Sequence, residues 1–120
     1  MRATIVRTFA FDAAPRLDTF PDGHKCTRVH GHTFSCDVVV EGEVDPTTGY
    51  ILDFGELKAA IEPLRQRLDH HYLNDVEGLD KPTAELLAKW IYDRLAPNVP
   101  GLVEIVLRET PSNRVHYRGE

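Results

Sequence analysis

Apolar and polar residues alternate near both ends of the chain, and this period of two predicts β-strands. The first predicted strand covers residues 3–14, and its apolar phase, interrupted by Arg7, consists of Ile5, Phe9, Phe11 and Ala13. The second covers residues 31–44, and its apolar phase consists of Phe34, Cys36, Val38 and Val40. Each strand therefore has one face suited to a core, and we assign Cys36 to that core.

The middle of the chain has the spacing of two amphipathic helices. Asp53 is a suitable N-cap for a helix over residues 54–67, in which Pro63 predicts a kink or a break. The apolar face of this helix consists of Leu57, Ile61, Leu64 and Leu68. Thr83 is the expected N-cap of a second helix that ends near Ala96.

Two more strands are predicted, over residues 102–110 and 114–118. The order strand, strand, helix, helix, strand, strand predicts an α+β unit with both helices on one face of a four-stranded antiparallel sheet. The other face keeps residues such as Val6 and Val39, which favours a homo-oligomer. His116 is expected to be a satisfied histidine on the core face.

Composition restricts the class of protein. The length of 120 residues predicts a single domain over residues 1–120. The formal net charge of −5 argues against nucleic acid as the main partner, and no apolar run has the length of a membrane span. Two cysteines ten residues apart and the lack of a secretory signal predict a cytoplasmic protein.

A thiol and two imidazoles lie within seven residues at the start of the second predicted strand. If His30 and His32 already belong to that strand, both lie on its apolar face. Neutral imidazole is a common zinc ligand, so the pair predicts a transition-metal site. It is only half a zinc site, because catalytic zinc normally has three protein ligands. Cys26 lies in the preceding loop, residues 16–29, and its sulfur can return to the same face.

Two acidic positions are further candidates. Glu109 shares the apolar phase of residues 102–110, and there it can accept paired N–H donors from a flat heterocycle. The alternative is a strand-end glutamate whose tip reaches water. Asp69 beside His70 can orient an imidazole that moves protons and can stabilise its charged form. The alternative is a polar loop in which His70 or His71 caps the end of the helix.

Three separated motifs together resemble the 6-pyruvoyltetrahydropterin synthase family. They are Cys-x3-His-Gly-His at residues 26–32, Leu-Asp-His-His-Tyr-Leu-Asn at 68–74 and Arg-Glu-Thr at 108–110. The resemblance is strongest to the bacterial branch, the 6-carboxytetrahydropterin synthases of the queuosine pathway. The three residues between Cys26 and His30 are typical of that branch.

The resemblance implies the tunnelling fold, in which subunits pair their sheets into an oligomeric barrel and stack as a hexamer of two trimers. It also implies active sites between subunits. The implied reaction converts 7,8-dihydroneopterin triphosphate to 6-carboxy-5,6,7,8-tetrahydropterin, acetaldehyde and triphosphate. By position, Cys26 is then the general base, Asp69 and His70 form a second acid–base relay, and Glu109 anchors the pterin ring. The candidates to meet the triphosphate are Arg16, Lys25 and Arg28.

The resemblance implies that His30 and His32 are zinc ligands, but this chain departs from the family pattern at the third ligand. The family pattern is Ala-Ala-His-Arg-Leu, and this chain has Pro15 where the histidine belongs. Proline offers no side-chain donor, so three outcomes are open: loss of the metal, weak binding through two imidazoles plus water or substrate, or a substitute ligand. The candidate substitutes are Cys26, His24 and His116.

Three hypotheses about function follow. The leading one is a carbon–carbon lyase of the 6-carboxytetrahydropterin synthase type, impaired to the extent that the metal is lost. The second, motivated by Pro15, is a non-catalytic paralogue that binds a pterin. The third is a 6-pyruvoyl-forming or aldolase-like pterin enzyme on the same fold.

Overall fold

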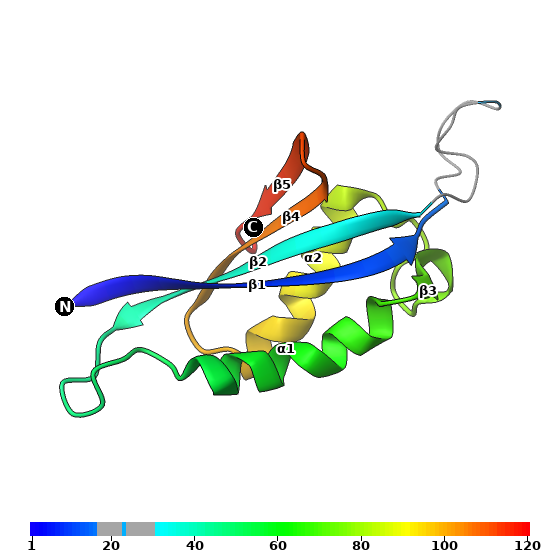
Figure 1. The fold of residues 1–120 in the computed structure, drawn as a ribbon. Coiled ribbons are helices and arrows are strands. Elements are labelled where there is room, and N and C mark those ends of the chain that lie inside the picture. The colour runs from blue at the N-terminus through cyan, green and yellow to red at the C-terminus, as the bar shows by residue number, and fades with distance from the viewer. Residues whose placement is uncertain (17–22, 24–30) are drawn as a thin grey trace.

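The protein folds into one sheet covered on one face by two helices. The computed structural model describes residues 1–16, 23 and 31–120. Figure 1 shows α1 and α2 on the same side of the long β1–β2 hairpin. The elements in chain order are β1 (Arg2–Ala14), β2 (His32–Glu43), α1 (Phe54–Leu68), β3 (His71–Tyr72), η2 (Leu73–Asp75), α2 (Ala84–Leu95), η3 (Ala96–Asn98), β4 (Leu102–Thr110) and β5 (Asn113–Tyr117).

The sheet has five strands in the order β3-β1-β2-β4-β5. The expectation of four antiparallel strands is therefore wrong in number and in direction, because β3 pairs in parallel with the end of β1 through Ala13 and His71. The other strand pairs are antiparallel, as expected. β3 has two residues, and so short a segment has no period that a sequence pattern can reveal.

The core lies between the sheet and the two helices, and the predicted apolar phases form it. Cys36 and Val38 on β2 are fully buried, as are Leu57 and Leu68 on α1. Burial raises the pKa of the Cys36 thiol, so this side chain stays protonated and acts as an apolar filler. Among the described residues, no helix is long and apolar enough to cross a membrane.

Both predicted N-caps are confirmed, but Pro63 does not break α1. The Asp53 carboxylate accepts a hydrogen bond from Gly55 N, and the Thr83 hydroxyl accepts one from Leu86 N. α1 continues through Pro63 to Leu68. Proline removes the bond to the carbonyl four residues earlier, on Ala59, and both residues are exposed, so water can satisfy that carbonyl.

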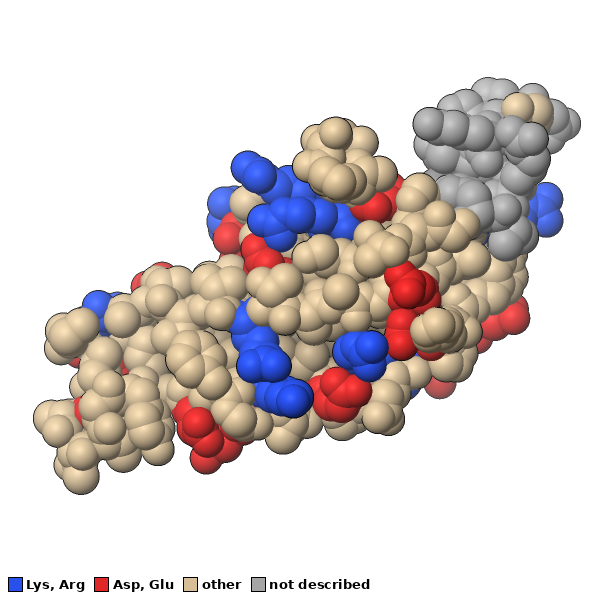
Figure 2. All heavy atoms as spheres, in the orientation of Figure 1, with Lys and Arg blue, Asp and Glu red and all other residues tan. Residues whose placement is uncertain are grey.

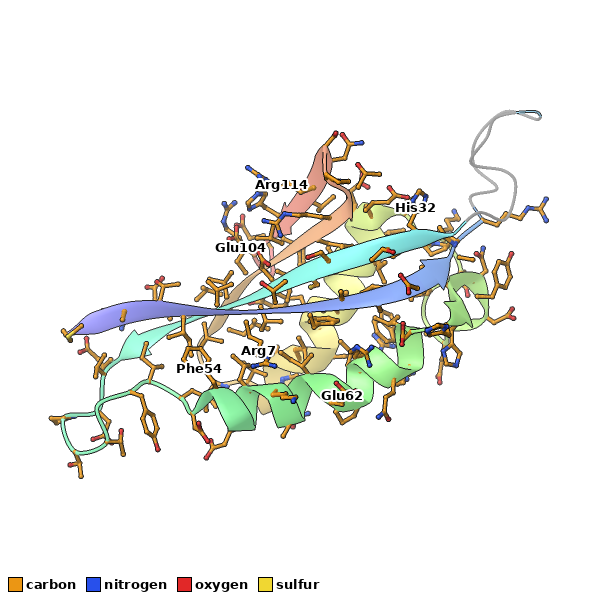
Figure 3. The ribbon with its side chains drawn as sticks, viewed as in Figure 1. Arg7, His32, Phe54, Glu62, Glu104 and Arg114 are labelled. Atoms are coloured by element: carbon orange, nitrogen blue, oxygen red, sulfur yellow. The ribbon has the colours of Figure 1, made fainter. Side chains whose placement is uncertain are left out.

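The face of the sheet away from the helices is partly apolar and partly charged. Val6 is 48% exposed and lies opposite Val39. His116 is also on this face, so its expected place in the core is wrong: Val115 and Tyr117 supply the inner phase of β5. The His116 ring contacts Glu104 and Arg114 instead, both labelled in Figure 3. In Figure 2, Lys and Arg side chains gather over this part of the molecule.

Candidate active site

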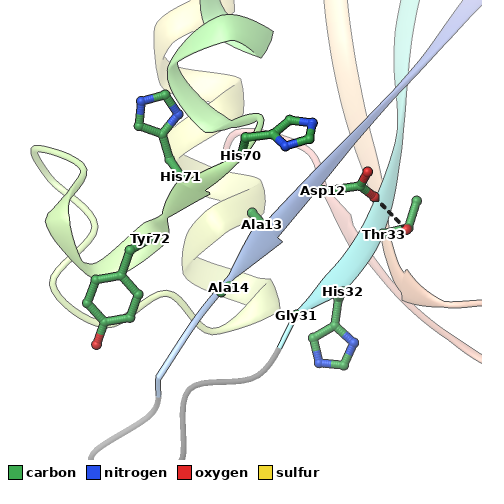
Figure 4. Close-up of a pocket in the computed structure, with 9 residues that line it drawn as sticks. All are labelled: Asp12, Ala13, Ala14, Gly31, His32, Thr33, His70, His71 and Tyr72. Atoms are coloured by element: carbon green, nitrogen blue, oxygen red, sulfur yellow. Dashed lines mark hydrogen bonds between the residues drawn. The ribbon is translucent and has the colours of Figure 1, made fainter.

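An open pocket lies where β1 ends, β2 begins and the chain leaves α1. Its walls come from three short segments, residues 12–14, 31–33 and 70–72, and Figure 4 shows them in close-up. Two of the three sequence motifs that carry the family resemblance, at residues 26–32 and 68–74, therefore contribute to one concavity.

Backbone pairing brings these segments together. Ala13 lies opposite His32 in the antiparallel ladder and opposite His71 in the parallel one. The Thr33 hydroxyl donates a 2.6 Å hydrogen bond to the Asp12 carboxylate, which links β1 to β2 by side chains as well. The end of β1 is thus the common support of the site.

Asp69 is held at the C-terminal end of α1 by both of its carboxylate oxygens. Oδ1 accepts a 2.9 Å bond from the backbone N–H of Asp12, and Oδ2 accepts a 3.2 Å bond from Arg65. The backbone N–H of Asp12 is the main cause that lowers the pKa of Asp69, and the charges of His70 and Arg65 lower it further. Asp69 is therefore a fixed carboxylate that stays ionised at neutral pH.

His70 follows with a backbone in the left-handed region, at φ +59°. Such a φ is unusual for a residue with a side chain, and the 2.6 Å hydrogen bond from His70 N to the Asp12 carbonyl helps to hold it. The imidazole is 77% exposed, and its Nε2 lies 3.6 Å from Asp69 Oδ2. This distance is too long for a hydrogen bond, so Asp69 acts on His70 through charge. The capping alternative fits His71, whose Nδ1 lies 2.7 Å from the Asp69 carbonyl.

Asn74 has a structural role that the sequence interpretation missed, although it is the last residue of the second motif. Its amide oxygen accepts a 2.8 Å bond from Arg16 N, and its amide nitrogen donates a 2.8 Å bond to the Arg16 carbonyl. These two bonds fix the backbone that leaves β1. An asparagine amide can do this because it carries both a donor and an acceptor.

Glu109 and His32 contact each other at the other side of the site. His32 Nε2 lies 3.2 Å from Glu109 Oε1, and both side chains are less than one-third exposed. Glu109 lies at an irregularity in the pairing of β4 with β5, between Arg108 and Thr110. Such bulges redirect side chains and are common next to active sites. Glu109 therefore does not simply end in water, which was the alternative for a strand-end glutamate.

The described part of one chain forms two groups rather than one cluster. Figure 4 shows His70 on the α1 side of β1, whereas His32 extends from β2 on the other side. Cys26 and His30, the predicted base and the other predicted zinc ligand, lie outside the described residues. The substitute ligand His24 lies outside them as well.

The described donors do not complete a zinc site. Pro15 is buried and follows Ala13 by two residues on the side of His32, but its side chain offers no donor atom. His116 cannot replace it from its place on the outer face. Ligand atoms of Asp12, Asp69 and His70 lie within 4.8 Å of one another, yet hydrogen bonds from the protein already engage both carboxylates, so this group needs no cation.

Comparison with known proteins agrees with the resemblance of the motifs. The family model described as 6-pyruvoyl tetrahydropterin synthase matches residues 4–120. A 6-carboxy-5,6,7,8-tetrahydropterin synthase of Synechocystis is 40% identical over 94% of this chain and 91% of its own length. A dihydroneopterin monophosphate aldolase of Pyrococcus furiosus is also 40% identical, over 88% of this chain and 85% of its own.

The fold agrees as well. The structure of 6-pyruvoyl tetrahydropterin synthase from Caenorhabditis elegans superimposes with a TM-score of 0.92 at 30% identity, and the match covers 100% of this chain and 97% of the other. The sequence motifs, the fold and the nearly full-length matches all agree, and the chain belongs to the 6-pyruvoyl tetrahydropterin synthase family.

Proposed function

We propose that this protein is a 6-carboxy-5,6,7,8-tetrahydropterin synthase that acts in the cytoplasm in queuosine biosynthesis. It would convert 7,8-dihydroneopterin triphosphate to 6-carboxytetrahydropterin, acetaldehyde and triphosphate. The observation that carries this proposal is the fixed Asp69–His70 pair at a pocket of a chain that is 40% identical to a relative named for that activity. The pair supplies an ionised carboxylate next to an exposed imidazole, which is what proton transfer requires.

In this proposal some residues of the chain transfer protons and others bind the pterin. Cys26 would remove a proton near C6 of the pterin, because a thiol near cations ionises close to neutral pH. His70 would move a second proton at the side chain of the substrate, with Asp69 stabilising its charged form. Glu109 would accept hydrogen bonds from the 2-amino group and N3 of the pterin. His32 contacts one of its oxygens, and no described residue forms a hydrogen bond with the other.

We expect zinc at His30 and His32 to be bound weakly. Position 15 is on the side of His32 but holds a proline, so the third family ligand is absent.

We also propose a hexamer of two trimers with its active sites between subunits. In one chain His70 and His32 lie on different sides of β1, so a neighbouring subunit would bring the relay of one chain to the Glu109 of another. The sheet has an open edge for such pairing, because β3 covers β1 only at Ala13 and Ala14. The exposed Val6 offers apolar surface on the face that a barrel would enclose.

Incubation of the pure protein with 7,8-dihydroneopterin triphosphate tests the activity. We expect acetaldehyde and the carboxypterin as products, measured by derivatisation and by chromatography. Full metal occupancy without turnover would exclude the proposal.

The Pyrococcus furiosus relative supports a second candidate, an aldolase acting on a dihydroneopterin phosphate, because its identity to this chain is also 40%. Product analysis distinguishes these enzymes and a 6-pyruvoyl-forming one. A pterin-binding paralogue would bind the substrate without forming any product, and Pro15→His would then add activity.

A further inference from the structure

Arg65, in the last turn of α1, joins the helix, the sheet and the candidate relay. Its Nη2 donates to Asp69 Oδ2 at 3.2 Å, its Nε to the Ala10 carbonyl at 3.0 Å and its Nη1 to Glu62 Oε1 at 3.1 Å. The side chain is only 34% exposed. Glu62 is labelled on α1 in Figure 3. Three contacts through one planar group fix the direction of that group, which a flexible ammonium would not achieve.

This guanidinium determines what the Asp69 carboxylate can do. Oδ1 accepts a bond from the backbone of Asp12 and Oδ2 accepts one from Arg65, so rotation of the carboxylate towards His70 would break these bonds. In this orientation Asp69 Oδ2 lies 3.6 Å from His70 Nε2. The positive charge of Arg65 also opposes the effect of Asp69 on the imidazole, since an unopposed carboxylate holds a histidine in its charged form.

We propose that Arg65 is a positioning residue that keeps the His70 imidazole beside, but not bound to, the Asp69 carboxylate, so that His70 can both take up and release a proton. The consequence for catalysis rests on the function proposed above, whereas the effect on His70 itself does not. Among the described residues, the other titratable or charged groups around the pair include Asp12 from β1, Glu62 from α1, His71 and Tyr72 from β3, and His32 across the pocket.

The first test measures the pKa of His70 by NMR titration of the full-length protein labelled at histidine, with the resonance assigned from His70→Gln. In Arg65→Met we expect that pKa to rise by about half a pH unit or more, since one charge is removed at close range. Arg65→Lys keeps the positive charge but not the planar guanidinium with its several N–H donors, and it should raise the pKa of His70 by a smaller amount.

Two control variants separate this role from general effects on α1. Arg67→Met removes another arginine of the same turn, whose guanidinium lies over Trp90 rather than near Asp69. Glu62→Gln removes the acidic partner of Arg65 without changing its bond to Asp69. Both should leave the pKa of His70 within about 0.2 units of its original value, as expected for changes at more distant, solvent-screened charges.

The second test is kinetic and uses 7,8-dihydroneopterin triphosphate. We expect Arg65→Met to lower kcat about tenfold, a part of the total effect of general acid–base catalysis, with little change in KM. The pH profile of kcat should shift in the same direction as the pKa of His70. In an Asp69→Asn background, Arg65→Met should have almost no further effect on kcat, because Arg65 acts through Asp69.

An unchanged His70 pKa in folded Arg65→Met would overturn the inference, as would an equal loss of kcat in both backgrounds. If Arg65→Met does not fold, Arg65→Lys decides, and an unchanged pKa in that variant also overturns it. A wild-type protein without turnover whose His70 pKa still rises in Arg65→Met would refute the proposed function and leave the positioning role intact. Turnover by the wild-type protein, together with an unchanged His70 pKa in Arg65→Met, would support the proposed function and refute the positioning role.

Discussion

Replacing Pro15 with histidine should restore the zinc donor that this chain lacks. Ala13 lies directly opposite His32, and Pro15 follows two residues later in a buried position, so a side chain there belongs to the same side of the sheet end. An imidazole at that point would join His32 and the proposed ligand His30. Three protein ligands are the normal complement of a catalytic zinc ion.

The size of the effect can be bounded. Loss of a supporting group around a metal site weakens binding about 10–100-fold, and a direct ligand should matter at least as much. We therefore expect Pro15→His to tighten zinc binding at least tenfold. At a fixed zinc concentration above both Kd values, each tenfold adds about 1.4 kcal/mol to the free energy of unfolding. For a domain of this size that corresponds to a rise in Tm of roughly 5 °C.

The assay compares zinc content after dialysis, and Tm with and without zinc, for the native chain, Pro15→His and Pro15→Ala. The alanine variant removes the proline ring without adding a donor, so it should resemble the native chain in its response to zinc. Equal zinc retention in the native chain and in folded Pro15→His would refute the reasoning, because a substitute ligand would then already complete the site.

Asn74→Ala removes two hydrogen bonds to the Arg16 backbone and should lower the free energy of unfolding, measured by urea titration, by about 1–2 kcal/mol. The control Asn98→Ala, at an exposed position, should change this free energy by less than about 0.5 kcal/mol. Because the pKa of Asp69 is lower in the folded state than its ordinary value of 3.8, its contribution to stability is present above that pH and lost as the pH falls below it. The destabilisation by Asp69→Asn should therefore be largest near neutral pH and disappear in acid, and a constant difference across urea titrations at several pH values would contradict this. Cys36, buried with a raised thiol pKa, should react with an aromatic disulfide reagent only after unfolding, and rapid reaction of this thiol in the folded protein would contradict its place in the core.

The sequence alone determined the long elements of the fold. The strand and helix periods of apolar residues indicate which side of each element is buried, and the core forms from these buried sides. The expected bounds of β4 agree with the structure, and those of β1, β2 and both helices differ by one or two residues. The motifs around residues 26–32, 68–74 and 108–110 were enough to identify the family, which the comparisons confirm.

Tertiary structure alone decided the features that depend on partners distant in the chain. β3 exists because the backbone after α1 meets the end of β1. Pro63 is tolerated because Ala59, whose carbonyl loses its helical partner, is exposed, so water can satisfy that carbonyl. Arg65 is one of several arginines in the sequence until folding places it between Ala10 and Asp69. A periodic pattern records the burial of each residue but not the identity of the residue it will meet, and for that reason the support of the site became visible only in three dimensions.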